Sequence, residues 1–202
     1  MSCRADFDYS SITFDAFHTY PSKNRKKILN DTDLLKIMVK KVLNEHRYQH
    51  SLSVAQTAAE LAIAHHADVN KAYTAGLLHD VTKGFDEEWQ DGYLRYYDPE
   101  KLAYPFPVKH SFTAKYYLRE KLNFHDSEIL NAVYNHTICT SRNKLAVILY
   151  IADKREPLRG IEDDLLDLAF KDLYAAYKAI NEDSISYLRK RGKDERIIKT
   201  GL

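Results

Sequence analysis

The chain has 202 residues, 45% of them hydrophobic and 29% charged, which is enough to bury one sizeable core. Its 30 Lys and Arg against 29 Asp and Glu leave a formal net charge of +1, so bulk charge favours neither a nucleic-acid nor a membrane-surface partner. The longest apolar run, Leu145 to Ala152, is far shorter than the ~20 residues that a membrane span needs. We expect one globular domain with no nucleic-acid and no membrane partner.

Composition also predicts the fold class and the compartment. Only 6 residues are Gly, and the abundant Leu, Ala, Ile and Tyr favour helices over tight β-turns, which predicts an all-α protein. The first residues show no basic segment followed by an apolar one, so no secretory signal is expected. Two cysteines, Cys3 and Cys139, cannot build a disulfide framework, and a reducing, cytoplasmic location is the simplest expectation.

The first part of the chain divides into an extension and the start of a helical domain. Residues 1–31 lack a sustained apolar period and are interpreted as an N-terminal extension, either a disordered tail or the remnant of a longer architecture. The domain itself is expected over residues 32–202. Apolar stripes over residues 34–43 and 52–62 predict two helices separated by a break around residues 47–50.

Capping residues and prolines punctuate the middle of the chain. Asn70 is predicted to cap a helix that ends just after His79 and Asp80, with Gly84 as its C-terminal cap. Asp86 is predicted to cap a short aromatic helix, after which prolines mark a loop that delivers His110. Further helices are expected over residues 111–122, 126–136, 143–156 and 162–191, the last with a break near residues 170–172.

Several polar side chains stand where the helical pattern expects hydrocarbon. His79 and His136 fall on the apolar faces of their helices, and Asp153 directly follows the longest apolar run. An unpaired carboxylate buried there would cost several kcal/mol, so it needs a cation. Taken singly, each residue is better explained by a private partner, such as Lys83 or Arg155 for an aspartate.

Taken together, these residues form a set near the ends of predicted helices, which is typical of a metal site in the core of a helical bundle. His79 and Asp80 lie about 100° apart on a helix, so they can straddle one cation or bridge two. Imidazole and carboxylate ligands favour Fe, Mn, Co or Zn over Mg or Ca. The candidate metal ligands are His50, His79, Asp80, His110, His136 and Asp153.

Four segments surround these candidate ligands: residues 47–51 (RYQHS), 75–83 (AGLLHDVTK), 136–137 (HT) and 152–159 (ADKREPLR). In this order they resemble the HD-domain superfamily of metal-dependent phosphohydrolases, and more narrowly its symmetrical diadenosine tetraphosphate hydrolases of the YqeK type. The match covers about residues 34–197. The resemblance implies an all-α fold, an HD-domain helical bundle with a metal site in its core.

The resemblance also implies a chemistry. Asp80 would bridge two divalent transition-metal ions, with Fe expected and Mn, Co or Zn as alternatives. A hydroxide bound between two metals ~3.5–4 Å apart would attack a phosphorus in line and cleave diadenosine tetraphosphate symmetrically into two ADP. The resemblance divides the ligands between the metals: His50, His79, Asp80 and Asp153 for one, and Asp80, His110 and His136 for the other.

Basic side chains near the ligands are the candidate contacts for phosphate. Lys83, one turn after the HD pair, and Arg159 are the expected phosphate binders. Arg47 is a third candidate, although an Arg at a helix boundary more often packs on the surface or pairs with a carboxylate. Asp80 and Lys83 are the expected catalytic residues. Glu156 is as compatible with orienting a ligand imidazole as with acting as a catalytic acid.

Other features leave alternatives open. The glycines that usually follow the equivalents of His110 and His136 are replaced by Phe112-Thr113 and Ile138-Cys139, which leaves the shape beside the second metal and the substrate preference open. The alternatives are an HD-fold phosphohydrolase of another nucleotide, a non-catalytic nucleotide-binding module and a di-iron oxygenase. The expected partner is a small nucleotide, and a homodimer is among the oligomeric states that the sequence allows. Aromatic candidates for stacking on adenine lie near the prolines: Tyr96, Tyr97, Tyr104 and Phe106.

Overall fold

The structure is a computed structural model that describes residues 32–138 and 140–192. These residues form helices and connecting turns without a strand, which confirms the expected all-α fold. No helix in this part of the chain is long and apolar enough to cross a membrane. The expected N-terminal extension, residues 1–31, and both cysteines lie outside the described residues.

The helix that carries the first candidate ligand starts earlier than the sequence predicts. The Asn44 side chain caps α4 (Glu45–Ala64) by accepting a hydrogen bond from the backbone N–H of Arg47. The predicted break around residues 47–50 is therefore wrong, because this cap starts the helix before its first buried residue. The correction places Arg47 and His50 one turn apart on a regular helix.

The next helix, α5 (Val69–Leu78), ends where the candidate ligands begin. Its N-cap is Asp68, which accepts a hydrogen bond from the backbone of Lys71, and not the predicted Asn70. His79 is the C-cap residue, so Gly84 lies beyond the helix, in the turns that follow. The predicted end just after the HD pair is thus at least two residues too late.

Close packing of α5 on α4 brings the ends of these helices together. An added Cβ at Gly76 would lie 2.5 Å from the Cα of Ala55, a separation that no side chain tolerates. Glycine therefore allows the two backbones to touch, and the imidazole rings of His50 and His79 lie 5.2 Å apart between their centroids.

In the middle of the chain, one predicted helix cap is confirmed and one predicted loop is part of a helix. Asp86 caps α6 (Glu87–Tyr97) as predicted, and a short 3₁₀ helix, η1 (Pro99–Ala103), follows. The helix expected over residues 111–122 is α7 (Phe106–Leu122), which begins five residues early: Pro105 is its N-cap and Pro107 its second residue, positions where no N–H is needed. His110 is consequently held on α7 and is not delivered by a loop.

The last helices follow the predicted ranges closely. Asp126, Asn143 and Asp172 are N-caps, and the last of these produces the expected break. The elements are α8 (Ser127–Asn135), α9 (Lys144–Arg155), η2 (Pro157–Arg159), α10 (Leu165–Lys171) and α11 (Leu173–Lys190).

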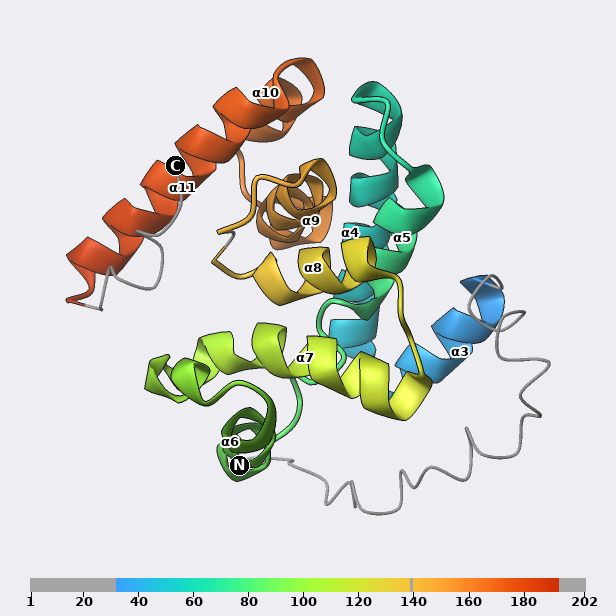
Figure 1. Cartoon of the computed structure of the whole chain (residues 1–202). Coiled ribbons are helices and arrows are strands. Elements are labelled where there is room, and N and C mark those ends of the chain that lie inside the picture. Colours follow the sequence, from blue (N-terminus) through green and yellow to red (C-terminus); the bar gives the residue numbers. More distant parts are fainter. Residues whose placement is uncertain (1–31, 139, 193–202) are drawn as a thin grey trace.

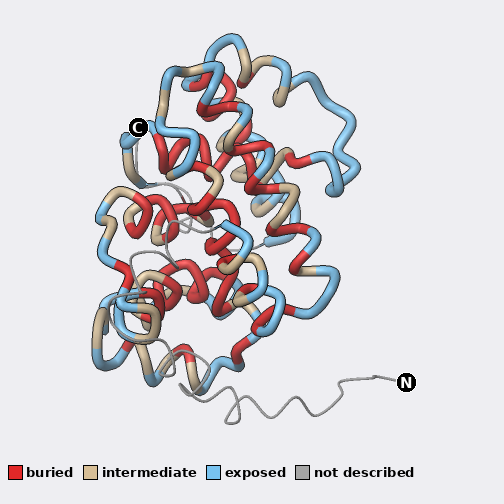
Figure 2. Tube along the Cα trace, turned by 90° about the vertical axis from the view of Figure 1, so that its right-hand side faces the viewer, coloured by how far each residue is buried: buried red, intermediate tan, exposed pale blue. Residues whose placement is uncertain are grey.

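Helix α9 is at the centre of the arrangement. Figure 1 shows it nearly end-on, with α11 on one side, α4 on the other and α8 beneath it, while α6 and α7 form the lower part of the molecule. Every residue from Leu145 to Asp153 is buried, and buried segments occupy the interior of the tube in Figure 2. Asp153 therefore stands at the end of the most enclosed helix, where a carboxylate needs compensating partners.

Candidate metal centre

The structure brings the six candidate ligands together at one buried place. They come from α4, the end of α5, α7, the C-terminus of α8 and the last turn of α9. All six residues are at most 7% exposed: His50, His79, Asp80, His110, His136 and Asp153.

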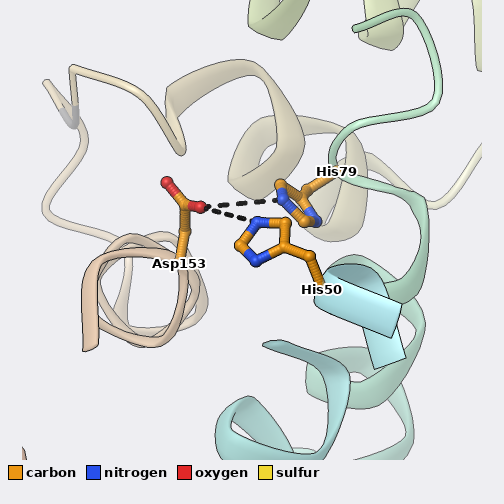
Figure 3. Close-up of side chains that lie close together, drawn as sticks. All are labelled: His50, His79 and Asp153. Carbon is orange, nitrogen blue, oxygen red and sulfur yellow. Dashed lines mark ion pairs between the residues drawn. The ribbon is translucent and has the colours of Figure 1, made fainter. Parts of the chain in front are cut away.

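One half of the cluster is built around Asp153. Its Oδ1 lies 3.2 Å from His50 Nε2 and 3.8 Å from His79 Nε2, and Figure 3 shows both rings turned toward the carboxylate. The opposite ring nitrogens are occupied, since His50 Nδ1 lies 3.0 Å from Glu156 Oε1 and His79 Nδ1 lies 2.7 Å from the Gly76 carbonyl. A carbonyl only accepts, so Nδ1 of His79 is the donor and its Nε2 carries a lone pair.

The other half is built around Asp80. Its Oδ1 lies 3.1 Å from His110 Nε2 and 3.6 Å from the Nε2 atoms of both His136 and His79. Its Oδ2 lies 3.2 Å from a guanidinium nitrogen of Arg47. The ring of His136 is fixed like that of His79, because its Nδ1 donates to the Val133 carbonyl at 2.7 Å. Asp80 thus contacts histidines of both halves, as a shared ligand would.

The donor set fits a divalent transition metal. The Nε2 atoms of His50 and His79 are buried and make no hydrogen bond with any described residue, although buried polar atoms normally have a partner. Two groups of three residues could each hold an ion, because within each group the donor atoms all lie within 4.8 Å of one another. They are His50, His79 and Asp153, and His79, Asp80 and His136.

His110 is placed differently from the other candidate ligands. Its Nε2 lies 3.0 Å from His136 Nε2, within the cluster, yet His110 belongs to neither of the two groups above. Its Nδ1 faces the Lys83 ammonium at 3.1 Å, whereas the Nδ1 atoms of the other three histidines face an oxygen acceptor. These groups differ from the division that the resemblance implies: Asp80 is absent from the first group, and His79 stands in the second where His110 was expected. The division of ligands between two metals stays a prediction.

Burial and charge prepare the cluster for a cation. Burial lowers the pKa of His79 to about 4 and that of His110 to about 3, so both are neutral at pH 7. Burial alone would raise the pKa of Asp80 and Asp153, but the imidazoles beside them, and the Lys154 ammonium beside Asp153, hold both pKa values well below the usual range. The cluster thus combines two buried, charged carboxylates with at least two neutral imidazoles, a donor set that suits a divalent cation.

A cleft of about 1140 Å³ opens onto this cluster, and Asp80, His110 and Asp153 form part of its lining. The three predicted phosphate binders line it as well. Arg47 pairs with Asp80, while Lys83 donates to the Pro107 carbonyl at 3.0 Å. Arg159 donates to Asp153 Oδ1 at 2.6 Å and through Nε to the backbone carbonyl of Asp153.

Two residues next to the cluster sharpen the sequence interpretation. Glu156 is 2% exposed, and its second oxygen accepts a hydrogen bond from the backbone of Leu158 at 2.7 Å, so both oxygens are occupied and its contacts favour orienting His50. Lys154, which the sequence reasoning missed, lines the cleft and lies 3.0 Å from Asp153 Oδ2. Only its position next to Asp153 could have indicated it.

The aromatic residues expected to stack on adenine do not line the described cleft. Tyr104 packs edge-on against Phe112 at 5.1 Å, and Tyr97 stacks on Tyr116 at 5.0 Å between ring centroids. The rings of Tyr97 and Tyr104 belong to the packing between α6, α7 and η1. Stacking of the four aromatic residues on adenine stays a prediction, which the lining of this cleft does not support.

Comparisons with known proteins give one family and several relatives. The HD domain family matches residues 47–158. A symmetrical bis(5'-nucleosyl)-tetraphosphatase of Halalkalibacterium halodurans is 33% identical over 168 residues, which are 77% of this chain and 86% of that protein. Its Bacillus subtilis counterpart is 32% identical over 160 residues, with the same two shares.

Two further likenesses concern a longer protein and a solved structure. A Mycoplasma pneumoniae protein named probable nicotinate-nucleotide adenylyltransferase/Ap4A hydrolase is 33% identical over 88% of this chain, but this chain spans only 53% of its length. A crystal structure from Clostridium acetobutylicum, described as a predicted HD superfamily hydrolase involved in NAD metabolism, superposes with a TM-score of 0.70 at 27% identity. The matched region covers 81% of this chain and 90% of the chain in that crystal structure.

Proposed function

This chain belongs to the HD-domain family, and we propose that it is a divalent-metal-dependent hydrolase that cleaves diadenosine tetraphosphate symmetrically into two ADP. The observation that carries the proposal is the buried cluster itself, with two imidazole nitrogens lacking a hydrogen-bond partner at the base of a cationic cleft. Relatives named symmetrical tetraphosphatases match this chain over most of their length, which supports the choice of substrate.

We propose that two divalent ions are held by the six clustered side chains, with Asp80 shared between them and iron as the expected metal. Such ions, when bound, polarise phosphoryl oxygens and lower the pKa of water to near 7. The protein contributes fixed geometry: the Nδ1 hydrogen bonds of His50, His79 and His136 prevent the rings from rotating and keep each Nε2 directed into the cluster.

The cations of the cleft suit a polyphosphate chain. Arg47 contacts Asp80, and Lys83 contacts His110, while Lys154 and Arg159 contact Asp153. Two cations therefore stand at each end of the ligand cluster, which favours a phosphate chain that extends equally to both sides of the bond to be broken.

The arginines retain donors for phosphate while they hold the ligand carboxylates. Arg159 uses Nε and one terminal nitrogen on Asp153, and Arg47 uses one terminal nitrogen on Asp80. A guanidinium has five N–H groups, so each arginine has at least one nitrogen left for a phosphoryl oxygen. We assign these side chains to substrate positioning and Lys83 to neutralising charge on the phosphate chain.

The test is a product analysis on metal-reconstituted protein. With diadenosine tetraphosphate, ADP should be the sole early product, and Asp80→Asn protein purified in the same way should form it about a thousandfold more slowly or less, which excludes a contaminating hydrolase. AMP together with ATP would refute symmetrical cleavage, and tight binding without turnover under any metal would refute the enzyme. The cytoplasmic location expected from the sequence stays a prediction for cell fractionation, and light scattering decides between a monomer and a homodimer.

A further inference from the structure

The C-terminal half of α11 forms a wall of the cleft. All residues of α11 that are buried lie in its first half, between Leu173 and Ile180, where they cover the core. The second half contributes Asp183, Ser184, Tyr187 and Leu188 to the lining of the cleft. This part of the helix projects apolar side chains beyond the core, so packing alone does not account for them.

Tyr187 is the most prominent of these side chains. It is 53% exposed, and Ile161, which lines the same cleft, is 49% exposed. The guanidinium carbon of Arg191 lies over the Tyr187 ring, 4.7 Å from its centroid. A half-exposed ring that a cation covers on one face offers its other face to a flat ligand.

Charge is balanced at this end of the cleft, in contrast to the metal end. Arg155, a basic residue of the lining, pairs with Asp163 at 2.8 Å and with Asp183 of α11 at 3.0 Å, so its charge is neutralised. An additional phosphate would meet two carboxylates here. The cleft therefore combines a cationic segment beside the ligand cluster with an aromatic and aliphatic segment beside α11, which matches a ligand with an anionic chain and a flat, apolar end.

We infer that Tyr187, together with Ile161, forms a nucleobase subsite in which the tyrosine ring stacks on one base of a nucleoside polyphosphate. The inference rests on the proposed function for the class of ligand and adds the residues that recognise its base. Base stacking on an aromatic side chain tolerates different bases, because every base has a π-face. The subsite would thus strengthen nucleotide binding without selecting strongly among bases.

Direct binding separates this inference from catalysis. The affinities of ADP and of inorganic pyrophosphate for the full chain are measured by calorimetry for the wild type, Tyr187→Ala and Tyr187→Phe. Tyr174→Ala is the matched control, because Tyr174 is 46% exposed on the same helix and does not line the cleft. Circular dichroism and thermal melting establish that every variant is folded.

Loss of the ring should weaken ADP binding about tenfold or more, the range measured for one stacked base. Tyr187→Phe and Tyr174→Ala should stay within about twofold of the wild type, and pyrophosphate binding should be the same in all four proteins. In turnover, Tyr187→Ala should raise KM and leave kcat unchanged.

Unchanged ADP affinity in Tyr187→Ala would overturn the subsite, as would an equal loss for pyrophosphate or the absence of ADP binding by the wild type. Because binding is measured without turnover, a chain that binds ADP through Tyr187 but does not cleave diadenosine tetraphosphate would refute only the proposed function.

Discussion

Replacing Asp80 with Asn removes one negative charge from the centre of the ligand cluster and keeps the shape of the side chain. The Oδ1 atom lies between 3.1 and 3.6 Å from the Nε2 atoms of three histidines, and the Oδ2 atom faces Arg47. A neutral amide is a poor ligand for a transition metal and cannot bridge two ions as a carboxylate does. Bound metal should fall from about two equivalents per chain to one or none.

The expected loss of activity follows from the charge that the metals would stabilise. Metal stabilisation of a phosphoryl-transfer transition state contributes several kcal/mol, and each 1.36 kcal/mol changes a rate tenfold, so a loss of about 4 kcal/mol corresponds to a factor of about one thousand. We expect the turnover of folded Asp80→Asn protein to fall by about this factor or more.

The assay combines elemental analysis of gel-filtered protein with specific activity on diadenosine tetraphosphate. Asp91→Asn is the control, because Asp91 also pairs with a buried cation, Lys109, at 2.6 Å, but does not line the cleft. This variant should lose stability, by less than the roughly 3–5 kcal/mol of a fully buried broken pair because Glu87 still pairs with Lys109 at 3.3 Å, and keep its metal and its specific activity.

One result would refute the reasoning. If folded Asp80→Asn protein held as much metal as the wild type and retained its specific activity, Asp80 would be a structural ion-pair partner of Arg47 and not a metal ligand. Lower stability alone, with unchanged metal content, would lead to the same conclusion.

Three further predictions concern the surroundings of the cluster. Lys83→Met should raise KM about tenfold or more, since one charged hydrogen bond to phosphate contributes about 1.5–3 kcal/mol, and an unchanged KM in steady-state kinetics would argue against phosphate contact. Glu156→Gln should weaken metal affinity about 10- to 100-fold in competition with a chelator, because His50 loses its orienting carboxylate; equal affinity would contradict that role. In metal-free protein the pKa of His79 is lowered to about 4 by burial, whereas the unfolded chain takes up the proton near pH 6.5, so the free energy of unfolding should decrease by about 3 kcal/mol from this residue between pH 6.5 and 4. Urea unfolding across that range measures the effect, and a constant stability would exclude it.

The sequence predicts the helices and the ligand set because both depend on local patterns. Period and caps indicate α8 to α11 within a few residues, and polar residues at apolar positions or near predicted helix ends include the six side chains that the structure gathers. The starts of α4 and α7 are less accessible to such reasoning. A cap at Asn44 and prolines in the first turn of α7 extend these helices into stretches without an apolar period.

Other parts of the site depend on tertiary packing and cannot be derived from periodicity. The stripe along α11 is continuous from Leu173 to Leu188, but only its first half meets the core. Which end of a helix extends past its neighbours depends on where those neighbours end, in this case α9 and the turn at η2. Sequence periodicity alone therefore does not distinguish whether Tyr187 packs on the core or lines the cleft, whereas the structure places it in the lining of the cleft.

Helix ends also explain why histidine suits this site so well. His79 and His136 are the C-cap residues of α5 and α8, and each donates from Nδ1 to the carbonyl three residues earlier, at 2.7 Å in both cases. The last carbonyls of a helix lack the regular i+4 backbone donor, so the imidazole supplies one of them with a hydrogen bond while its own tautomer and orientation become fixed. The same hydrogen bond leaves Nε2 as the unprotonated nitrogen and directs it away from the helix. In the proposed metal centre a histidine at a helix C-terminus would thus be both a cap and a prearranged ligand, and two such helices that end at one buried carboxylate, Asp80, would supply much of that centre before any metal binds.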